Sequence, residues 1–219
     1  MTARRVAPLA ALLLAAAAFP LTAQDGVAVV QRAAAAYGAL SAFQADYVQV
    51  IADPMIGTFT SKGRLTQAGT NKLAMRFTDP DGDAIVMDGT WIWVYTPSTT
   101  PGQVLKAAIA GGDGFGPNVV AWLLDRPAQR YQVRYVRADT LSGHVTDVVA
   151  LSPRDPNMPF TEATLWLDRH DALPRRLEVI ERSGSRRTLA LDHVLADPRV
   201  RPSVFRFTPP AGVRVVDQN

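Results

Sequence analysis

Apolar and polar residues alternate with a period of two through most of this chain. The first clear case begins at Phe43, where Phe43, Ala45, Tyr47, Gln49 and Ile51 fall on one side of an extended segment. Residues two apart share a face of a strand, so this pattern predicts strands with one dry face. The later runs of this kind are Gly57–Gln67, Lys72–Thr78, Ala84–Met87, Trp91–Tyr95, Gln103–Ile109, Tyr131–Ala138, Val145–Leu151, Ala163–Leu167, Leu173–Glu181, Arg187–Val194 and Val204–Phe207. About a dozen strands joined by short turns predict an antiparallel meander within one domain, residues 24–219.

Helical spacing appears in two segments. Val27–Leu40 places Val30, Ala33, Ala34, Tyr37 and Leu40 on one side, which predicts an amphipathic helix. Residues 118–124 form a second, shorter candidate that is apolar almost all round, and the Gly111–Gly116 stretch before it predicts a hinge. These elements predict a mostly β (α+β) fold: an incomplete antiparallel β-barrel or strongly curved sheet covered by short helices. A many-stranded barrel is too wide for its own side chains to fill, so the fold predicts a hydrophobic cavity.

The N-terminus has the pattern of an export signal. Arg4 and Arg5 precede an apolar run over Val6–Phe19, which ends in Pro20-Leu21-Thr22-Ala23. This order predicts a signal peptide, residues 1–23, that is cleaved near Ala23. The apolar run is shorter than a membrane span requires, although an uncleaved anchor is the alternative. The chain has no cysteine, so it contains no disulfide and cannot itself be acylated at a cysteine.

Composition and motifs give little support to several functions. Lys and Arg number 23 against 20 Asp and Glu, a formal charge of +3, and two of the arginines lie in the leader. No basic run exceeds two residues, so nucleic-acid binding is not predicted. His144, His170 and His193 lack the spacing of metal ligands. The glycines of the Gly111–Gly116 stretch lack the spacing of a dinucleotide loop, and Ser183-Gly184-Ser185 lacks the G-x-S-x-G pattern. We therefore predict no enzymatic activity, cofactor or metal, and a triad assembled across the fold stays an alternative.

Three segments, in this order, carry a family resemblance. Ser41–Gln49 is an aromatic-alternating strand that ends in Gln. Asp79–Pro97 contains a proline turn, a short hydrophobic strand, an Asp-Gly turn and a strand that ends in Trp-x-Tyr-x-Pro. Val204–Asn219 contains two alternating phenylalanines, then Pro-Pro-Ala-Gly-Val. Together with the signal peptide, they resemble the periplasmic outer-membrane lipoprotein carrier family, the LolA-like proteins, over essentially the whole mature chain.

The resemblance implies a periplasmic carrier without enzymatic activity. Such a protein would bind lipoprotein acyl chains in a hydrophobic cavity as a monomer. It would receive lipoproteins from an inner-membrane ABC exporter and pass them to an outer-membrane acceptor. The candidate cavity residues are Phe43, Tyr47, Leu73, Met75, Phe77, Trp93 and Tyr95, and the candidate lid residues are Val119, Val120, Trp122 and Leu123. Ordinary core packing is the alternative interpretation of each of them.

One position departs from the family pattern. Before the strand at Lys72–Thr78, the family commonly has a basic residue followed by proline, and an arginine there is associated with the closed lid. This chain has Gly69-Thr70 instead. The departure predicts a different lid latch or a different cargo. Two other functions are kept as alternatives: a regulator of the same fold that senses lipid or lipoprotein, and a secreted hydrolase.

Overall fold

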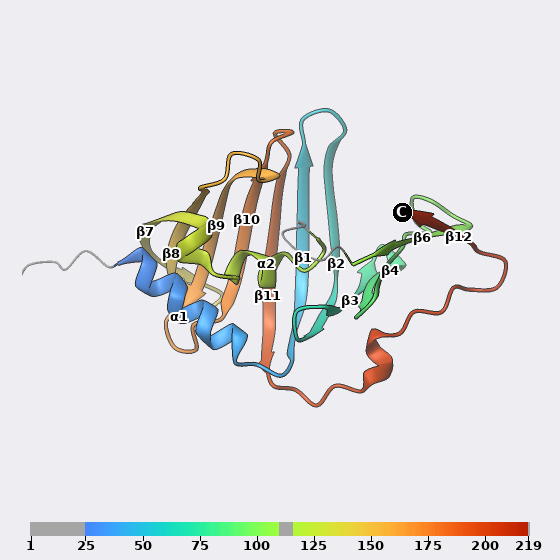
Figure 1. The fold of residues 1–219 in the computed structure, drawn as a ribbon, viewed down its shortest axis with the longest axis horizontal. Helices are drawn as coiled ribbons and strands as arrows, with labels where there is room; N and C mark the ends of the chain where they lie inside the picture. The colour runs from blue at the N-terminus through green and yellow to red at the C-terminus, as the bar shows by residue number, and fades with distance from the viewer. Residues whose placement is uncertain (1–24, 110–115, 219) are drawn as a thin grey trace, which may run out of the picture.

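The computed structural model describes residues 25–109 and 116–218. The predicted signal peptide and most of the predicted hinge lie outside these residues. Within them, twelve strands form one large curved sheet in the order β12-β6-β5-β4-β3-β2-β1-β11-β10-β9-β8-β7 (Figure 1). The fold is mostly β, as the alternation predicts.

The strands follow the predicted runs closely from β1 to β11. Their bounds are β1 Phe43–Asp53, β2 Gly57–Ala68, β3 Lys72–Asp79, β4 Asp81–Asp88, β5 Trp91–Tyr95, β6 Gln103–Ala108, β7 Tyr131–Leu141, β8 His144–Pro153, β9 Phe160–Asp168, β10 Pro174–Glu181, β11 Arg186–Ala196 and β12 Arg214–Gln218. Two antiparallel meanders, β1–β6 and β7–β11, meet where β1 pairs with β11. The β1–β11 pair therefore joins segments that are far apart in the sequence into one surface.

Three α-helices in the described part of the chain accompany the sheet. Helix α1 spans Gly26–Gly38, α2 spans Val119–Leu124, and α3 spans Pro127–Arg130. The carboxylate of Asp25 caps α1 by accepting a hydrogen bond from the Val27 amide at 2.9 Å. Helix α1 contacts β7, β8 and β9 as well as the other two helices. Among the described residues, no helix is long and apolar enough to cross a membrane.

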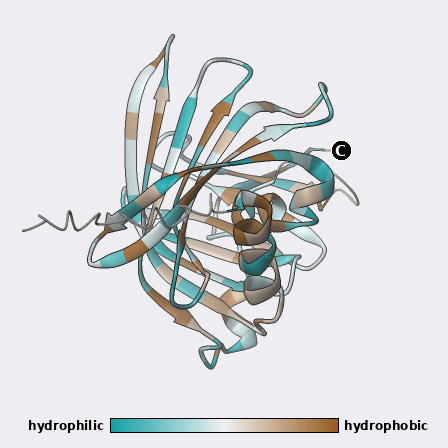
Figure 2. Ribbon diagram, turned by 90° about the vertical axis from the view of Figure 1, so that its left-hand side faces the viewer, coloured by the Kyte–Doolittle hydropathy of each residue, from teal (hydrophilic) through white to brown (hydrophobic). Residues whose placement is uncertain are grey.

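The hydrophobic core lies between the helices and the concave face of the sheet (Figure 2). Val30 and Ala33 from α1 are fully buried, as predicted from their spacing, and so is Leu123 from α2. They pack in one cluster with apolar residues of both meanders. The helices therefore occupy the hollow of the curved sheet with their own side chains.

The C-terminal segment differs from its prediction. Val204–Phe207 is not a strand: Pro202–Phe205 forms a 3₁₀ turn, η1, and the strand follows later as β12. Strand β12 pairs with β6 in the parallel direction, so the sheet is not wholly antiparallel. The physical reason is packing: Phe205 is buried, and the Phe207 ring stacks on aromatic rings of the sheet. Phe205 and Phe207 alternate with polar residues because each packs against the protein, and not because they lie on a strand.

Candidate functional site

Strand register shows which residues share the concave face. Tyr47 of β1 lies opposite Gly63 of β2 and Leu191 of β11. A Cβ at Gly63 would lie 2.1 Å from the backbone oxygen of Arg76, so only glycine fits there. The Tyr47 ring packs edge-on against Phe77, with 5.7 Å between their centroids. These contacts place both aromatic rings on the helix-covered side of the sheet.

The predicted cavity residues of β1 and β3 lie on this face. Phe43, Tyr47, Leu73 and Met75 are buried in the core cluster, and Phe77 packs against it while partly exposed. In this closed arrangement they form the packed interior of the protein. The structure thus brings the predicted residues of β1 and β3 together on one face.

The same face continues over β4, β5 and β6 as a half-buried apolar surface. Ile85 pairs with Val94, Val94 with Leu105, and Met87 with Ile92, so these residues share one side of the three strands. Ile85, Ile92, Val94 and Leu105 are partly exposed rather than buried. The sequence analysis did not select these four residues. Their alternation with the tryptophans of β5 is the signal that could have found them.

Trp93 and Tyr95 lie on the opposite face, which corrects their predicted place in the cavity. The Phe207 ring lies 5.7 Å from the ring of each, measured between centroids. The indole nitrogen of Trp93 also donates a hydrogen bond to Asp88 Oδ2 at 2.9 Å. The C-terminal segment thus covers these aromatics from outside the curved sheet.

Helix α2 contains the predicted lid residues and inserts most of them into the core. Val119, Val120 and Leu123 are buried, together with Leu124. Trp122 is partly exposed and meets the Phe160 ring nearly perpendicularly at 5.5 Å. The helix therefore covers apolar surface that would be exposed if α2 moved away.

Polar contacts hold α2 at both ends. The Asn118 side-chain nitrogen donates to the backbone oxygen of Thr70 at 3.2 Å, while its Oδ1 accepts from the Ala121 amide at 3.4 Å. At the other end, Arg130 Nη1 donates to the backbone oxygen of Trp122 at 3.1 Å, and the guanidinium lies 4.1 Å above the Trp122 ring. Thr70 is one of the two residues that depart from the family pattern. The backbone oxygen of Thr70 thus binds the first end of α2 directly, through Asn118.

A hollow of about 350 Å³ opens beside α2. Helix α1 contributes Ala34 and Tyr37, the β2–β3 turn contributes Gly69 and Thr70, and α2 contributes Leu124. The Tyr37 hydroxyl donates a hydrogen bond to Gln67, and burial raises the pKa of Tyr37 well above its ordinary value. The phenol therefore stays neutral, and the hollow has a polar but uncharged edge at this point.

One polar group inside the concave face has no partner among the described residues. The Tyr47 hydroxyl is buried without a hydrogen bond. Burial raises the pKa of Tyr47, and the nearby negative charge of Asp83 raises it further. The Tyr47 hydroxyl is therefore a neutral group on the concave face.

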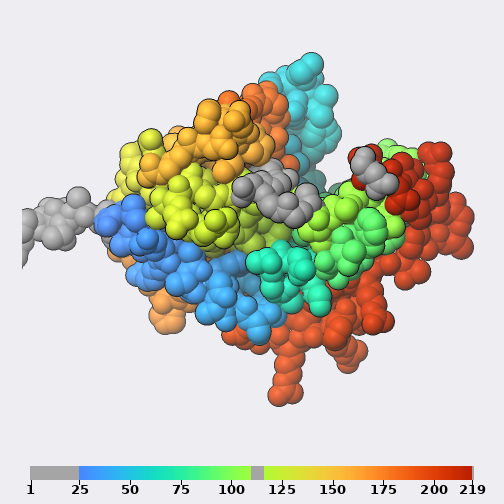
Figure 3. Space-filling view, in the orientation of Figure 1, coloured from blue at the N-terminus to red at the C-terminus, as the bar shows by residue number. Residues whose placement is uncertain are grey.

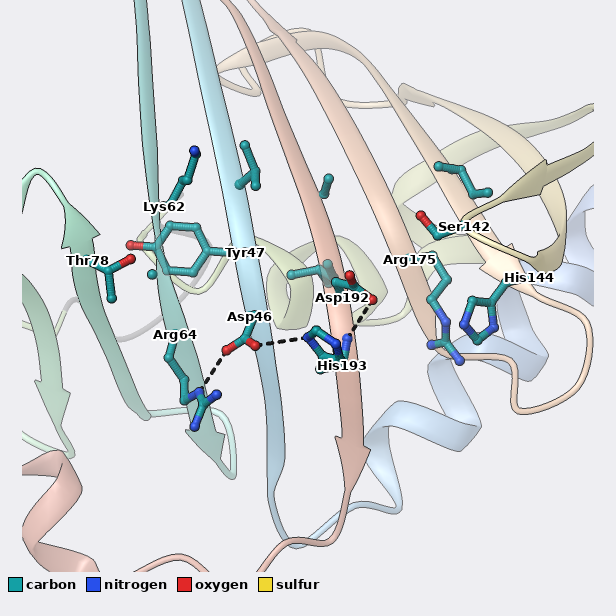
Figure 4. Close-up of a pocket in the computed structure, with 15 residues that line it drawn as sticks. Asp46, Tyr47, Lys62, Arg64, Thr78, Ser142, His144, Arg175, Asp192 and His193 are labelled. Carbon is teal, nitrogen blue, oxygen red and sulfur yellow. Dashed lines mark hydrogen bonds and ion pairs between the residues drawn. The ribbon is translucent and has the colours of Figure 1, made fainter.

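A separate groove of about 630 Å³ crosses the outer side of β2, β1 and β11 (Figure 4). Near its centre, Asp46 accepts from Arg64 Nε at 2.8 Å and lies 3.1 Å from His193 Nδ1. The hydrogen bond from Arg64 is the main reason that the pKa of Asp46 is lowered. Opposite charges are thus paired along this groove, and its lining differs in character from the apolar concave face.

A second His–Asp pair lies near the β7–β8 turn. His144 Nδ1 lies 2.6 Å from Asp168 Oδ2, and Arg175 binds the same oxygen at 2.9 Å. Ser142 also lines the groove. Its hydroxyl makes no hydrogen bond to His144 in the described part of the chain. Within that part there is also no cluster of metal-ligating side chains.

Comparison with known proteins places the chain in a family whose members are named lipoprotein carriers. The family described as "Outer membrane lipoprotein carrier protein LolA" matches residues 39–208. The chain belongs to this family, which confirms the resemblance drawn from the sequence. Outer-membrane lipoprotein carrier proteins from Xanthomonas axonopodis pv. citri and Salmonella typhi are 28% and 25% identical to it. The first match covers 72% of both chains; the second covers 82% of this chain and 83% of the relative.

One solved structure supports the fold, and a second is reported for comparison. An uncharacterized conserved protein from Thermus thermophilus matches with a TM-score of 0.56 at 12% identity, covering 89% of this chain and 100% of the other. A LolA superfamily protein from Nitrosomonas europaea matches with a TM-score of 0.41 at 14% identity, covering 84% and 99%. At such low identity, the first of these similarities establishes the fold alone.

Proposed function

We propose that this protein is a periplasmic chaperone that carries lipoproteins by their acyl chains. It takes them from an inner-membrane ABC exporter and delivers them to an outer-membrane acceptor, acting as a monomer without enzymatic activity. Residues 1–23 direct export and are removed, and residues 24–219 form the carrier domain. The observation that carries this proposal is the concave apolar face, which is filled partly by α2 and left half-exposed over β4–β6.

The acyl chains would lie along the concave face. The proposed binding surface includes Phe43, Tyr47, Leu73, Met75 and Phe77, and it extends over Ile85, Ile92, Val94 and Leu105. The half-buried part offers the first contact, and the buried part becomes available when α2 moves. Val119, Val120, Trp122 and Leu123 are the lid in this mechanism, because they cover the same surface from within.

Energetics explain why a carrier needs a closed form. Burial of a chain of about 15 methylenes contributes roughly 12 kcal/mol at about 0.8 kcal/mol per methylene. Two or three chains would exceed the range of reversible binding. Displacing α2 from the core opposes part of this gain, because its own apolar side chains lose their burial. The cost of opening the lid therefore lowers the net affinity for the cargo, so that the cargo can be released to an acceptor.

Two adjacent residues test the binding surface. Ile92 lies on the concave face, whereas its neighbour Trp91 has the Lys106 ammonium 3.8 Å above its ring on the other face. We expect Ile92→Glu to abolish binding of a fluorescent diacyl lipopeptide, because it places a carboxylate in the path of the chains. Trp91→Glu should still bind, since its carboxylate can pair with Lys106. Equal binding by both folded variants would reject the proposed face.

Depletion in the native bacterium tests the transport role. Outer-membrane lipoproteins should then accumulate in the inner membrane, as measured by membrane fractionation. Normal localisation after depletion would reject the shuttle. If the protein were then recovered with a membrane-bound signalling partner, the regulator alternative would replace it.

A further inference from the structure

The β1–β2 hairpin ends in an exposed apolar tip. Among the described residues, Met55 and Ile56 are the most exposed large apolar side chains, at 92% and 71%, and Phe59 is 51% exposed. The hairpin projects beyond the neighbouring strands of the sheet, where it forms the cyan protrusion in Figures 1 and 3. Isolated exposed apolar residues are common on protein surfaces, but three together on one projection indicate contact with an apolar partner.

Two backbone amides of the tip are hydrogen-bonded within the protein, and the turn is held in place. Asp53 Oδ1 accepts hydrogen bonds from the Met55 amide at 2.8 Å and the Ile56 amide at 3.1 Å. The hydroxyl of Ser185, in the adjacent β10–β11 turn, donates to Asp53 Oδ2 at 2.5 Å. Backbone donors that are already bonded do not need water, and this is what entry into an apolar medium requires. The two apolar side chains are thus presented outward on an ordered turn.

The charges beside the tip are largely neutralised within the protein. Arg186 pairs with Glu178, and Arg187 pairs with Glu181 at 3.1 Å. Arg182 keeps its charge while it donates to the backbone oxygen of Met158 at 2.7 Å, and the carboxylate of Asp53 at the tip balances that charge. A surface of this kind has no net basic face to attract anionic lipids or an acidic protein. Contact through the tip would therefore depend on the apolar side chains themselves.

We propose that the β1–β2 tip inserts Met55 and Ile56 into the interfacial region of a lipid bilayer, independently of lipid charge. A narrow convex projection fits a deformable medium without needing a matching pocket. Two side chains bury far fewer carbons than a myristoyl chain, which alone gives only marginal, reversible membrane binding. The contact is therefore transient. Insertion would bring the protein to a membrane surface without anchoring it there.

The absence of cysteine allows a clean test. Thr58 is exposed beside the tip, so Thr58→Cys can carry an environment-sensitive NBD label while Met55 and Ile56 remain. We expect the label to brighten and shift to the blue on titration with phosphatidylcholine vesicles, equally at low and high salt. Adding Met55→Ser and Ile56→Ser should weaken the apparent lipid affinity by about tenfold or more.

A matched control uses exposed apolar residues away from the tip. Val145→Ser and Leu195→Ser remove side chains that are 49% and 51% exposed, and they should leave the titration unchanged. The proposal is overturned if the label does not respond, if both double variants lose affinity equally, or if binding requires anionic lipid and disappears in salt. A tip that ignores vesicles but is protected by a purified membrane protein would also overturn it in favour of a protein partner.

Discussion

The side-chain amide of Asn118 donates a hydrogen bond to the backbone oxygen of Thr70 at 3.2 Å. This bond joins the start of α2 to the turn between β2 and β3. The same asparagine caps the helix through its Oδ1. One side chain thus both starts the helix that fills the concave face and fixes it against the sheet.

Replacing Asn118 with alanine should loosen α2. Loss of the cap alone costs about 1 kcal/mol, and the bond to Thr70 is lost with it. We expect faster amide hydrogen exchange over residues 119–124 and tighter binding of a diacyl lipopeptide, because the lid opens more readily. The control is Asn71→Ala, which removes a 3.3 Å bond from an exposed asparagine to the Gly89 oxygen and should leave α2 unaffected. Unchanged exchange in Asn118→Ala would contradict the latch.

The two tyrosines of the concave side should respond in opposite directions to loss of their hydroxyls. Tyr47→Phe removes a buried hydroxyl that has no partner among the described residues, so the free energy of unfolding should stay constant or rise by up to about 1 kcal/mol. Tyr37→Phe leaves the Gln67 oxygen without its donor, and it should lower that free energy by about 1–2 kcal/mol. Urea unfolding measures both. Destabilisation by Tyr47→Phe would show that its hydroxyl is bonded in solution.

Phe207→Ala should loosen the C-terminal segment without affecting lipid binding. The ring contacts Trp93 and Tyr95 on the outer face, and its loss should cost roughly 1–2 kcal/mol. Hydrogen exchange should increase in β12, while lipopeptide affinity stays unchanged. Phe59→Ala, at a residue 51% exposed, should change stability by no more than about 0.5 kcal/mol. A selective loss of lipopeptide affinity in Phe207→Ala would place the outer aromatics in the binding site after all.

Asp168 should make stability depend on acid pH. Burial alone would raise the pKa of Asp168, but the His170 amide, His144 and Arg175 together lower it. A carboxyl with a lowered pKa stabilises the fold above its unfolded value, about 3.9, and this contribution is lost as the pH falls through the folded value. Asp168→Asn should therefore cost about 2–3 kcal/mol at neutral pH, and this difference should shrink below about pH 4.

The exposed Asp81 provides the comparison for this pH effect. Asp81→Asn should follow the wild-type unfolding curve from about pH 7 to about pH 3, because substitutions at exposed positions usually change stability by no more than about 0.5 kcal/mol. A gap between wild type and Asp168→Asn that stays constant over this range would show that packing, rather than ionisation, explains the cost.

Alternation along the chain predicted the strands well because each strand has one face against the core. It could not show which face of β5 is the inner one. Trp93 and Ile92 are both apolar and partly buried, since the helix side covers one face and the C-terminal segment covers the other. The choice depends on Phe207, which is more than a hundred residues away in the sequence. The local alternation of apolar and polar residues in β5 does not reveal that contact.

The final strand was missed for a related reason. The 3₁₀ turn η1, rather than a strand, precedes Pro209-Pro210, and Arg214–Gln218 after it pairs along the edge of β6. Most of the side chains of β12 are exposed, so no alternation of buried and exposed positions marks this strand in the sequence. The replacement of the family's Arg-Pro pair was visible in the sequence. The contact between Asn118 and Thr70 was not, because only the fold brings the two residues together.

The parallel pairing of β12 has a consequence for synthesis of the protein. A ribosome makes residues 214–218 after every other described strand of the sheet, so β6 keeps an unprotected edge until they emerge. Such an edge is a template for any other extended polypeptide. A chain that stops before Arg214 would leave this edge uncovered, and the product would be inclined to self-associate and open to quality-control proteases.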